Sequence, residues 1–267
     1  MKILDQLVSH LSYADAILVS VQSTRGSVPR DVGAWMAVFA QGIVGTVGGG
    51  HLEFDAIAHA RQCALLAGTE EVQRYALGPG LGQCCGGEVH LRYERVTAAD
   101  IPMLNIRLRS EYTPVALFGG GHVGSALIDV LGNLPFVVRW IDSRDEIFPQ
   151  PLSANVQCEH SEPVDRAVSD LVAGSHVLVM SFSHAEDLDI VAACLVRQRA
   201  QGDLPYVGLI GSKTKWASFR QRLQSRGFTE AEIAHITCPI GVPGIADKRP
   251  EVIAVGVAAQ LLQRVRF

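Results

Sequence analysis

The spacing of apolar positions changes near the middle of the chain and divides it into two halves. In the first half, short apolar runs are separated by glycine turns; the runs 34–39 and 43–47 flank Gln41 and Gly42, which is typical of a hairpin. In the second half, short apolar runs alternate with stretches whose apolar residues recur at helical spacing. This pattern predicts an α/β chain: a smaller mixed α+β domain, mainly antiparallel, and then a Rossmann-like, doubly wound parallel sheet with helices on both faces.

A charged stretch separates the halves, and it shows no clear periodicity beyond a short helix that could form near residues 103–108. We predict an N-terminal domain over residues 1–98, a link over 99–112 and a C-terminal domain over 113–267. In the first domain we expect helices over 1–12 and 56–67, and strands over 16–21, 34–39, 43–47, 72–77 and 89–93. In the second we expect strands over 115–118, 137–141, 156–158, 177–180 and 207–210, and helices over 125–131, 163–171, 187–199, 213–226 and 250–264.

The central stretch, residues 112–124, carries the parts of a dinucleotide-binding turn. After an apolar strand, Gly119, Gly121 and Gly124 fall in G-x-G-x-x-G spacing and open a predicted helix, whose N-terminus attracts anions. The next predicted strand ends at Asp142, 23 residues after Gly119, where an acidic residue is expected to bind a ribose hydroxyl. The motif predicts the fold, but whether a nucleotide binds is a separate question, because one fold hosts many functions.

Residues 48–51 repeat the sequence of residues 119–122. The candidate ligand-binding residues of this first copy are Gly48, Gly49, Gly50, His51 and Glu53. Glu53 stands where the second copy has Gly124, and a carboxylate in the first helical turn would repel a phosphate. The first copy is therefore not expected to be a second dinucleotide site, although its backbone N–H groups are open to a polar ligand. The alternative is a tight turn with Glu53 as a helix-start residue.

Two adjacent cysteines, Cys84 and Cys85, lie in the glycine-rich loop 78–87. Cysteines in such a loop have little packing purpose, and nearby backbone N–H groups favour the thiolate, which binds metals. We interpret them as functional thiols. The alternative is that one of them fills a cavity.

Arg30 follows Pro29 in a stiffened loop. Its guanidinium could bind a phosphate or a pterin carbonyl through two hydrogen bonds. The alternative is an ion pair with Asp31 or Glu53.

Further polar residues follow the later strands of the predicted sheet. His184, with Ser181, Ser183 and Asp187 beside it, could contact a ligand or cap the next helix. Lys213 could face the same crevice, although a solvated lysine at a helix start is the more usual case. Neither a G-x-S-x-G motif nor a G-x-x-x-x-G-K-[ST] loop occurs in the sequence.

Composition limits the possible classes of function. Of the 267 residues, 48% are hydrophobic and 19% charged, which allows substantial cores, and the net charge of −4 argues against a nucleic-acid partner. We find no export signal and no apolar run of membrane-spanning length, so we expect a cytoplasmic protein with reduced thiols and no membrane partner. Cys63 and Cys194 lie in helical patterns and are expected to be buried apolar residues.

Taken together, the motifs resemble the XdhC/CoxI family of xanthine dehydrogenase accessory proteins. The resemblance rests on residues 26–30 with Gly33, 45–53, 77–87, 118–124, 208–213 and 238–241, followed by residues 250–259. It implies a cytoplasmic chaperone of purine catabolism that is not itself an enzyme, and that is often a homodimer. Such a chaperone binds molybdenum cofactor (molybdopterin), protects it while a cysteine desulfurase adds the sulfido ligand, and inserts it into xanthine dehydrogenase.

The candidate residues suit that implication, because molybdopterin carries a phosphate, a polar pterin and a dithiolene-bound metal. A site shared by both domains would contain Arg30, His51, Glu53, Cys85 and His122, with a phosphate or nucleotide at residues 119–124. In such a site Cys85 would contact molybdenum through the bound cofactor. Which domain holds the cofactor stays open. The alternatives are an NAD(P)-dependent oxidoreductase, favoured by the glycine motif and Asp142, and a pure scaffold between partner proteins.

Overall fold

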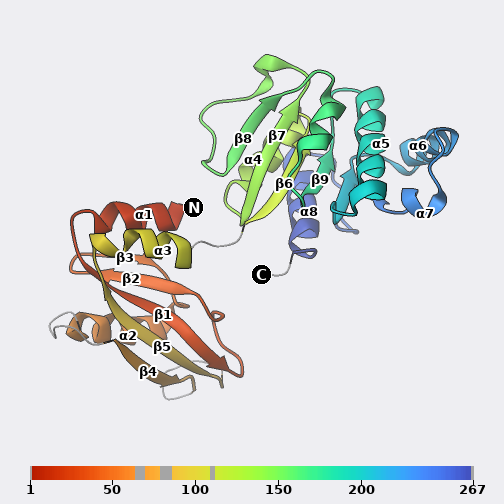
Figure 1. The fold of residues 1–267 in the computed structure, drawn as a ribbon. Helices are drawn as coiled ribbons and strands as arrows, with labels where there is room; N and C mark the ends of the chain where they lie inside the picture. The colour runs from red at the N-terminus through yellow and green to blue at the C-terminus, as the bar shows by residue number, and fades with distance from the viewer. Residues whose placement is uncertain (1, 64–69, 79–85, 109–111, 266–267) are drawn as a thin grey trace. The chain divides into compact units, whose positions relative to one another are not determined.

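The computed structural model describes residues 2–63, 70–78, 86–108 and 112–265 (Figure 1). The chain divides into two compact units, Met1–Ser110 and Glu111–Phe267. The predicted fold class, a Rossmann-like parallel sheet after a smaller mixed domain, is confirmed.

The first unit is built on an antiparallel sheet with the strand order β3-β2-β1-β5-β4. Its strands are β1 (Ala16–Arg25), β2 (Trp35–Phe39), β3 (Ile43–Gly45), β4 (Glu71–Ala76) and β5 (Glu88–Val96). Its helices are α1 (Lys2–Leu11), α2 (Gly50–Cys63), the 3-10 turn η2 (Ala98–Asp100) and α3 (Ile101–Arg107).

Both faces of this sheet are covered, because apolar residues of the central strand point alternately to each side. Ile17 and Val19 of β1 pack in one core with Leu52 of α2. Leu18 packs in a second core with Leu104 of α3 and with residues of α1. Helix α3 therefore belongs to the first unit, and the stretch 99–112 that we expected to link the domains is partly helical and packed.

The second unit is a parallel sheet with the strand order β11-β10-β9-β6-β7-β8. Its strands are β6 (Thr113–Phe118), β7 (Phe136–Asp142), β8 (Val156–His160), β9 (His176–Val179), β10 (Tyr206–Leu209) and β11 (Ile236–Thr237). Its helical elements are α4 (His122–Leu131), η3 (Asp145–Ile147), η4 (Val164–Asp170), α5 (His184–Gln201), α6 (Lys213–Ser225), α7 (Glu230–Ile233) and α8 (Pro250–Leu262).

This strand order is that of a dinucleotide-binding fold, in which the direction of strand addition reverses between the first and fourth strands, here β6 and β9. Helices α4 and α8 pack on one face of the sheet, and η4, α5 and α6 pack on the other (Figure 1). The sequence pattern missed β11 and α7, and the helix predicted over 163–171 is the 3-10 segment η4.

None of the helices in the described part of the chain is long and apolar enough to cross a membrane.

Candidate functional site

The glycine turn of the second unit lies where the strand order reverses. Gly119 follows β6 with φ of +119°, a left-handed value that favours glycine. A Cβ at this position would overlap the carbonyl oxygen of Met180, which follows β9. The N–H of Met180 also donates to Phe118 O at 2.9 Å. The carboxyl ends of β6 and β9 are thus in backbone contact, at the point where such folds bind ligands.

Gly124 and Gly121 serve this turn in different ways. Gly124 is buried, and a Cβ there would overlap Gly119 O, so its small size lets α4 pack against the turn. Gly121 is the N-cap of α4, and a Cβ there would meet no atom within 4 Å. His122, the first residue of α4, is exposed. Because the first N–H groups of a helix have no intrahelical acceptor, this open N-terminus offers donors and a partial positive charge to an anion.

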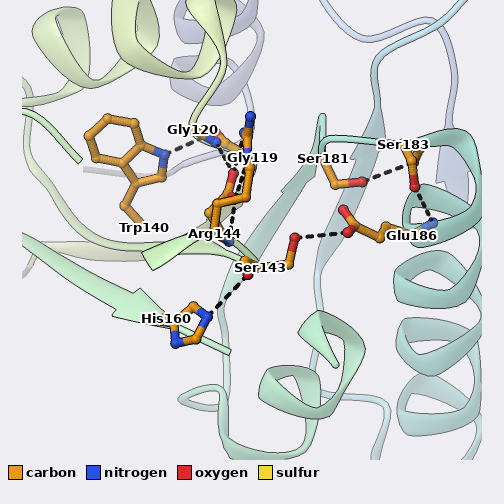
Figure 2. A network of polar contacts seen from close by, with 10 residues as sticks. Gly119, Gly120, Trp140, Ser143, Arg144, His160, Ser181, Ser183 and Glu186 are labelled. Carbon is orange, nitrogen blue, oxygen red and sulfur yellow. Dashed lines mark hydrogen bonds and ion pairs between the residues drawn. The ribbon is translucent and has the colours of Figure 1, made fainter. Parts of the chain in front are cut away.

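Asp142, the predicted ribose-binding residue, is engaged by the protein itself. It is 2% exposed. Its Oδ2 accepts from the N–H of Gly120 at 2.6 Å and from Nη2 of Arg144 at 2.9 Å, and its Oδ1 accepts from Nε and the backbone N–H of Arg144 at 2.8 and 2.9 Å. Figure 2 shows Arg144 beside Gly120, and both donate to this carboxylate. Four donors fill the acceptor positions of this carboxylate, so a ribose hydroxyl would first have to displace Arg144.

These contacts also set the ionisation of Asp142. Burial by itself raises the pKa of a carboxyl group, but the hydrogen bonds from Arg144 and Gly120 outweigh it and hold the pKa of Asp142 below its usual range. Asp142 is therefore a fixed carboxylate paired with a guanidinium, and not a group that exchanges protons near neutral pH.

A buried ion pair lies beyond the ends of β9 and β10. Lys215 Nζ is 2.6 Å from Asp187 Oδ2, and the two side chains are 11% and 3% exposed. Asp187 Oδ1 accepts from the N–H and the hydroxyl of Ser181, both at 2.8 Å, and Lys215 also donates to Ile210 O. Burial, with a smaller contribution from Asp187, raises the pKa of Cys238 to about 11 although Lys215 opposes the shift. The pair joins the first turns of α5 and α6, and the thiol beside it is protonated at neutral pH.

The remaining polar residues near this crevice have mainly structural contacts. Ser183 Oγ accepts from the N–H of Glu186 at 3.2 Å, which is the helix cap that one of our two interpretations predicts. His184 and Lys213 are exposed residues that begin α5 and α6. Ser143 Oγ donates to Glu186 Oε1 at 2.8 Å and so connects the end of β7 with α5 (Figure 2).

In the first unit, the glycine turn is closed by its own glutamate. Glu53 Oε2 accepts from the N–H groups of Val47 and Gly49 at 3.0 and 3.2 Å and from the hydroxyl of Thr46. The N–H of Gly48 donates to Thr46 Oγ1 at 3.1 Å. The carboxylate of Glu53 thus takes the place that an anionic ligand would occupy, as expected for a helix-start residue in a tight turn.

Arg30 lies beside this closed turn. A Cβ on Gly48 would be 2.6 Å from Pro29 Cγ and 3.5 Å from Arg30 Cγ, so the arginine loop packs directly on the turn. Arg30 is exposed, and among the described residues it forms no ion pair, so the alternative of a pair with Asp31 or Glu53 is not found there. Its guanidinium is available to an anion.

The end of the glycine-rich loop reaches the same region. A Cβ on Gly26 would be 3.3 Å from Gly87 Cα, and one on Gly87 would overlap the carbonyl of Ser27. Gly87 therefore packs on the loop that carries Arg30. Cys84 and Cys85 lie outside the described residues. The contact of Cys85 with molybdenum therefore stays a prediction.

Each unit thus brings together part of the predicted site. The first unit gathers Arg30, Gly48, Gly49, Gly50, His51 and Glu53, of which Arg30, Gly50 and His51 are exposed. The second unit gathers Gly119, Gly121, His122, Gly124 and Asp142. That Arg30, His51, Glu53, Cys85 and His122 share one crevice stays a prediction.

Two family profiles together cover most of the chain. Residues 12–76 match the XdhC and CoxI family, and residues 115–261 match the XdhC Rossmann domain. The chain belongs to the XdhC/CoxI family. The family resemblance drawn from the glycine, cysteine and arginine motifs is thereby confirmed.

A solved structure shares the fold over almost the whole chain. A protein of Bacillus halodurans, described as a xanthine dehydrogenase, has a crystal structure that matches with a TM-score of 0.79 over 99% of this chain and 96% of that chain. Since the two sequences are 20% identical, this likeness shows the fold alone.

The sequence is also similar to that of the uncharacterized protein YqeB of Escherichia coli (strain K12), with 28% identity over 255 residues. The match covers 92% of this chain but 43% of YqeB, so the chain spans less than half the length of that relative.

Proposed function

We propose that this XdhC-family chain is an accessory protein in the maturation of a xanthine dehydrogenase. In this proposal it binds molybdenum cofactor, protects it while a cysteine desulfurase supplies the terminal sulfido ligand, and delivers it to the dehydrogenase. Family membership supports the maturation role. The structural observation that carries the binding step is the open N-terminal turn of α4 at Gly121.

That turn suits the phosphate of the cofactor. The space beside Gly121 is open, because a Cβ placed there would meet no atom within 4 Å. The first N–H groups of α4 have no intrahelical acceptor. The nearest carboxylate of the turn, Asp142, is paired with Arg144, so its charge is balanced. In the first unit, Arg30 is a second exposed group that suits a phosphate or a pterin carbonyl. When bound, the cofactor supplies the molybdenum centre used by the target enzyme.

A carrier without turnover fits the ionisable groups of the second unit better than an oxidoreductase does. Asp142 is fixed by Arg144, and Asp187 is fixed by Lys215. Groups held in tight ion pairs are poor general acids and bases near neutral pH. The oxidoreductase alternative therefore needs an acid–base group other than these carboxylates.

The test is retention of the cofactor by the purified full chain. The protein is incubated with molybdenum cofactor and, separately, with nicotinamide dinucleotides, and each mixture is passed through gel filtration. We expect molybdenum and pterin to co-elute with the protein in about equal amounts. Absence of both from the protein fraction would overturn the proposal, and substrate-dependent reduction of a bound nicotinamide would favour the oxidoreductase.

The thiols of Cys84 and Cys85 are tested in the same assay. As soft ligands, they are expected to contribute to retention of the metal-bearing cofactor. We predict that Cys84→Ala or Cys85→Ala lowers the molybdenum retained per chain. Cys158→Ala is the matched control, since Cys158 is an exposed cysteine on β8. If the Cys84→Ala/Cys85→Ala double variant retains as much molybdenum as the wild-type protein, neither cysteine contributes to cofactor binding.

The same proposal includes a homodimer that binds xanthine dehydrogenase and a cysteine desulfurase in turn. Sedimentation of the full chain, alone and mixed with each purified partner, tests this part. We expect a dimer that forms a complex with each partner. A monomer that forms neither complex would contradict it.

A further inference from the structure

Three metal-ligating side chains meet at the end of α2 that is far from the glycine turn. His59 Nε2 is 3.3 Å from Glu71 Oε2, and Cys63 Sγ is 3.8 Å from the same oxygen. All three donor atoms lie within 4.8 Å of one another. In a tetrahedral zinc site with N, S and O ligands, metal–ligand bonds of roughly 2.0–2.3 Å place the donor atoms roughly 3.4–3.7 Å apart. The cluster therefore has nearly the dimensions of such a site.

Two separate elements bring these ligands together. His59 and Cys63 are four residues apart on α2, so they lie on one face of the helix. Glu71 is the first residue of β4, and the antiparallel register sets it opposite Tyr93 of β5. The ring of Tyr93 packs edge-on against His59 with centroids 4.7 Å apart, and its hydroxyl is 2.7 Å from that of Tyr75. The imidazole is thus held in place by an aromatic contact beside the carboxylate.

A simple ion pair between His59 and Glu71 explains this arrangement less well. The side chains of these residues are 26% and 44% exposed, and an ion pair at that exposure contributes little to stability. It also leaves unexplained why the thiol of Cys63, which packs beside the core of the first unit, approaches the same carboxylate. We expected both Cys63 and Cys194 to be buried apolar residues; Cys194 is fully buried in a hydrophobic core, but Cys63 is half-buried and directs its sulfur to a carboxylate.

We propose that His59, Cys63 and Glu71 bind a divalent cation of the zinc class, with water as the fourth ligand. The neutral imidazole, the thiolate and the carboxylate are the ligands that Zn²⁺ takes in proteins. Binding replaces the thiol proton, which leaves to solvent, and the two anionic ligands then balance the charge of the cation. Three protein ligands leave one position open to exchange, which is a feature of zinc sites that act on or transfer a ligand.

This cation site is distinct from the region of Arg30 and the first glycine turn. An α-helix rises about 1.5 Å per residue, so Cys63 lies roughly 20 Å along α2 from Gly50. The inference does not rest on molybdenum cofactor binding, and either proposal can fail without the other.

The experiment is a zinc titration of the metal-free full chain against a chromophoric chelator. It is done in a Cys84→Ser/Cys85→Ser background, which removes the two adjacent thiols of the glycine-rich loop as competing zinc ligands. We expect one Zn²⁺ per chain. Loss of outer-shell partners alone weakens metal sites about 10–100-fold, so Cys63→Ser and His59→Gln should weaken binding by at least about tenfold. Cys158→Ser, an exposed cysteine outside the cluster, should leave the affinity unchanged.

Cobalt gives a second readout, which can be taken first on the background protein with the cluster intact. Co²⁺ bound to the background protein should show a sulfur-to-cobalt charge-transfer band that Cys63→Ser abolishes. Failure to bind zinc in competition with the chelator, or wild-type affinity in both Cys63→Ser and His59→Gln, would overturn the proposal. If those variants do not fold, as judged by circular dichroism, absence of the charge-transfer band from the background protein would overturn it.

Discussion

The two glycine turns of this chain have almost the same sequence but differ in what they can bind. In the first, Glu53 accepts hydrogen bonds from the N–H groups of Val47 and Gly49, so the turn is closed by its own carboxylate. In the second, the equivalent position is Gly124, and the N-terminus of α4 stays open at Gly121. The residue at this one position therefore distinguishes the turns: a glutamate occupies the backbone N–H groups of the first turn, whereas a glycine leaves those of the second turn open to an anion.

The backbone contacts of the turns differ as well, and this difference predicts the largest effect. Gly119→Ala would force a Cβ into the carbonyl of Met180, and backbone at the switch point cannot yield easily. We expect it to destabilise the second unit by more than about 4 kcal/mol. At the equivalent Gly48, a Cβ would meet the side chain of Pro29 on a surface loop, so Gly48→Ala should cost about 2 kcal/mol. Urea unfolding of both full-length variants measures the difference; equal losses would contradict this account.

Removing the glutamate should open the first turn. Glu53→Ala leaves the N–H groups of Val47 and Gly49 without their acceptor, which should cost about 1–3 kcal/mol. Because an anion could then replace the carboxylate, added phosphate should raise the unfolding temperature of Glu53→Ala more than that of the wild-type protein.

Glu53→Gln serves as the control, since its amide oxygen can still accept these hydrogen bonds. No extra stabilisation of Glu53→Ala by phosphate would refute the idea that Glu53 closes an anion site.

Asp142 should give the second unit a distinctive sensitivity to acid. Its folded pKa lies below the unfolded value of about 3.9, so it stabilises the fold above about pH 4. That contribution is lost as the pH falls through the folded pKa. Asp142→Asn should cost about 1–3 kcal/mol at pH 7 and should show a smaller further loss at pH 3 than the wild-type protein. Asp129→Asn, an exposed residue of α4, should keep the wild-type pH dependence. Urea midpoints at the two pH values decide the matter.

The sequence was sufficient for the second unit where its signals are local. Apolar runs and helical spacing located most strands and helices, and the glycine spacing located the turn after β6. The missed elements are short: β11 has two residues and α7 has four, too few to establish a period. In the first unit, the charged stretch indicated only a short helix near residues 103–108; the observed α3 begins at Ile101 and is packed through the buried Leu104.

The site contacts were harder to predict because they depend on side chains that meet across the fold. Arg144 lies two residues beyond Asp142, a position where a nearby arginine is known to reach a nucleotide phosphate, and this signal could have been used. Lys215, and not Lys213, pairs with Asp187, because α6 turns the former toward the sheet. The meeting of His59, Cys63 and Glu71 requires both the helical phase of α2 and the register of β4 on β5.

The difference between the turns is tested most directly by giving the second turn a carboxylate of its own. Gly121 has the extended backbone of an N-cap and open space around its Cα, so Gly121→Asp should fold and should stabilise α4 by a few tenths of a kcal/mol. Its carboxylate would then occupy the N–H groups proposed to bind the cofactor phosphate. We predict that the molybdenum retained after gel filtration falls at least about tenfold, because a hydrogen bond from a backbone N–H to the charged phosphate is lost. The unfolding temperature should not fall. Wild-type retention in a folded Gly121→Asp protein would contradict the account.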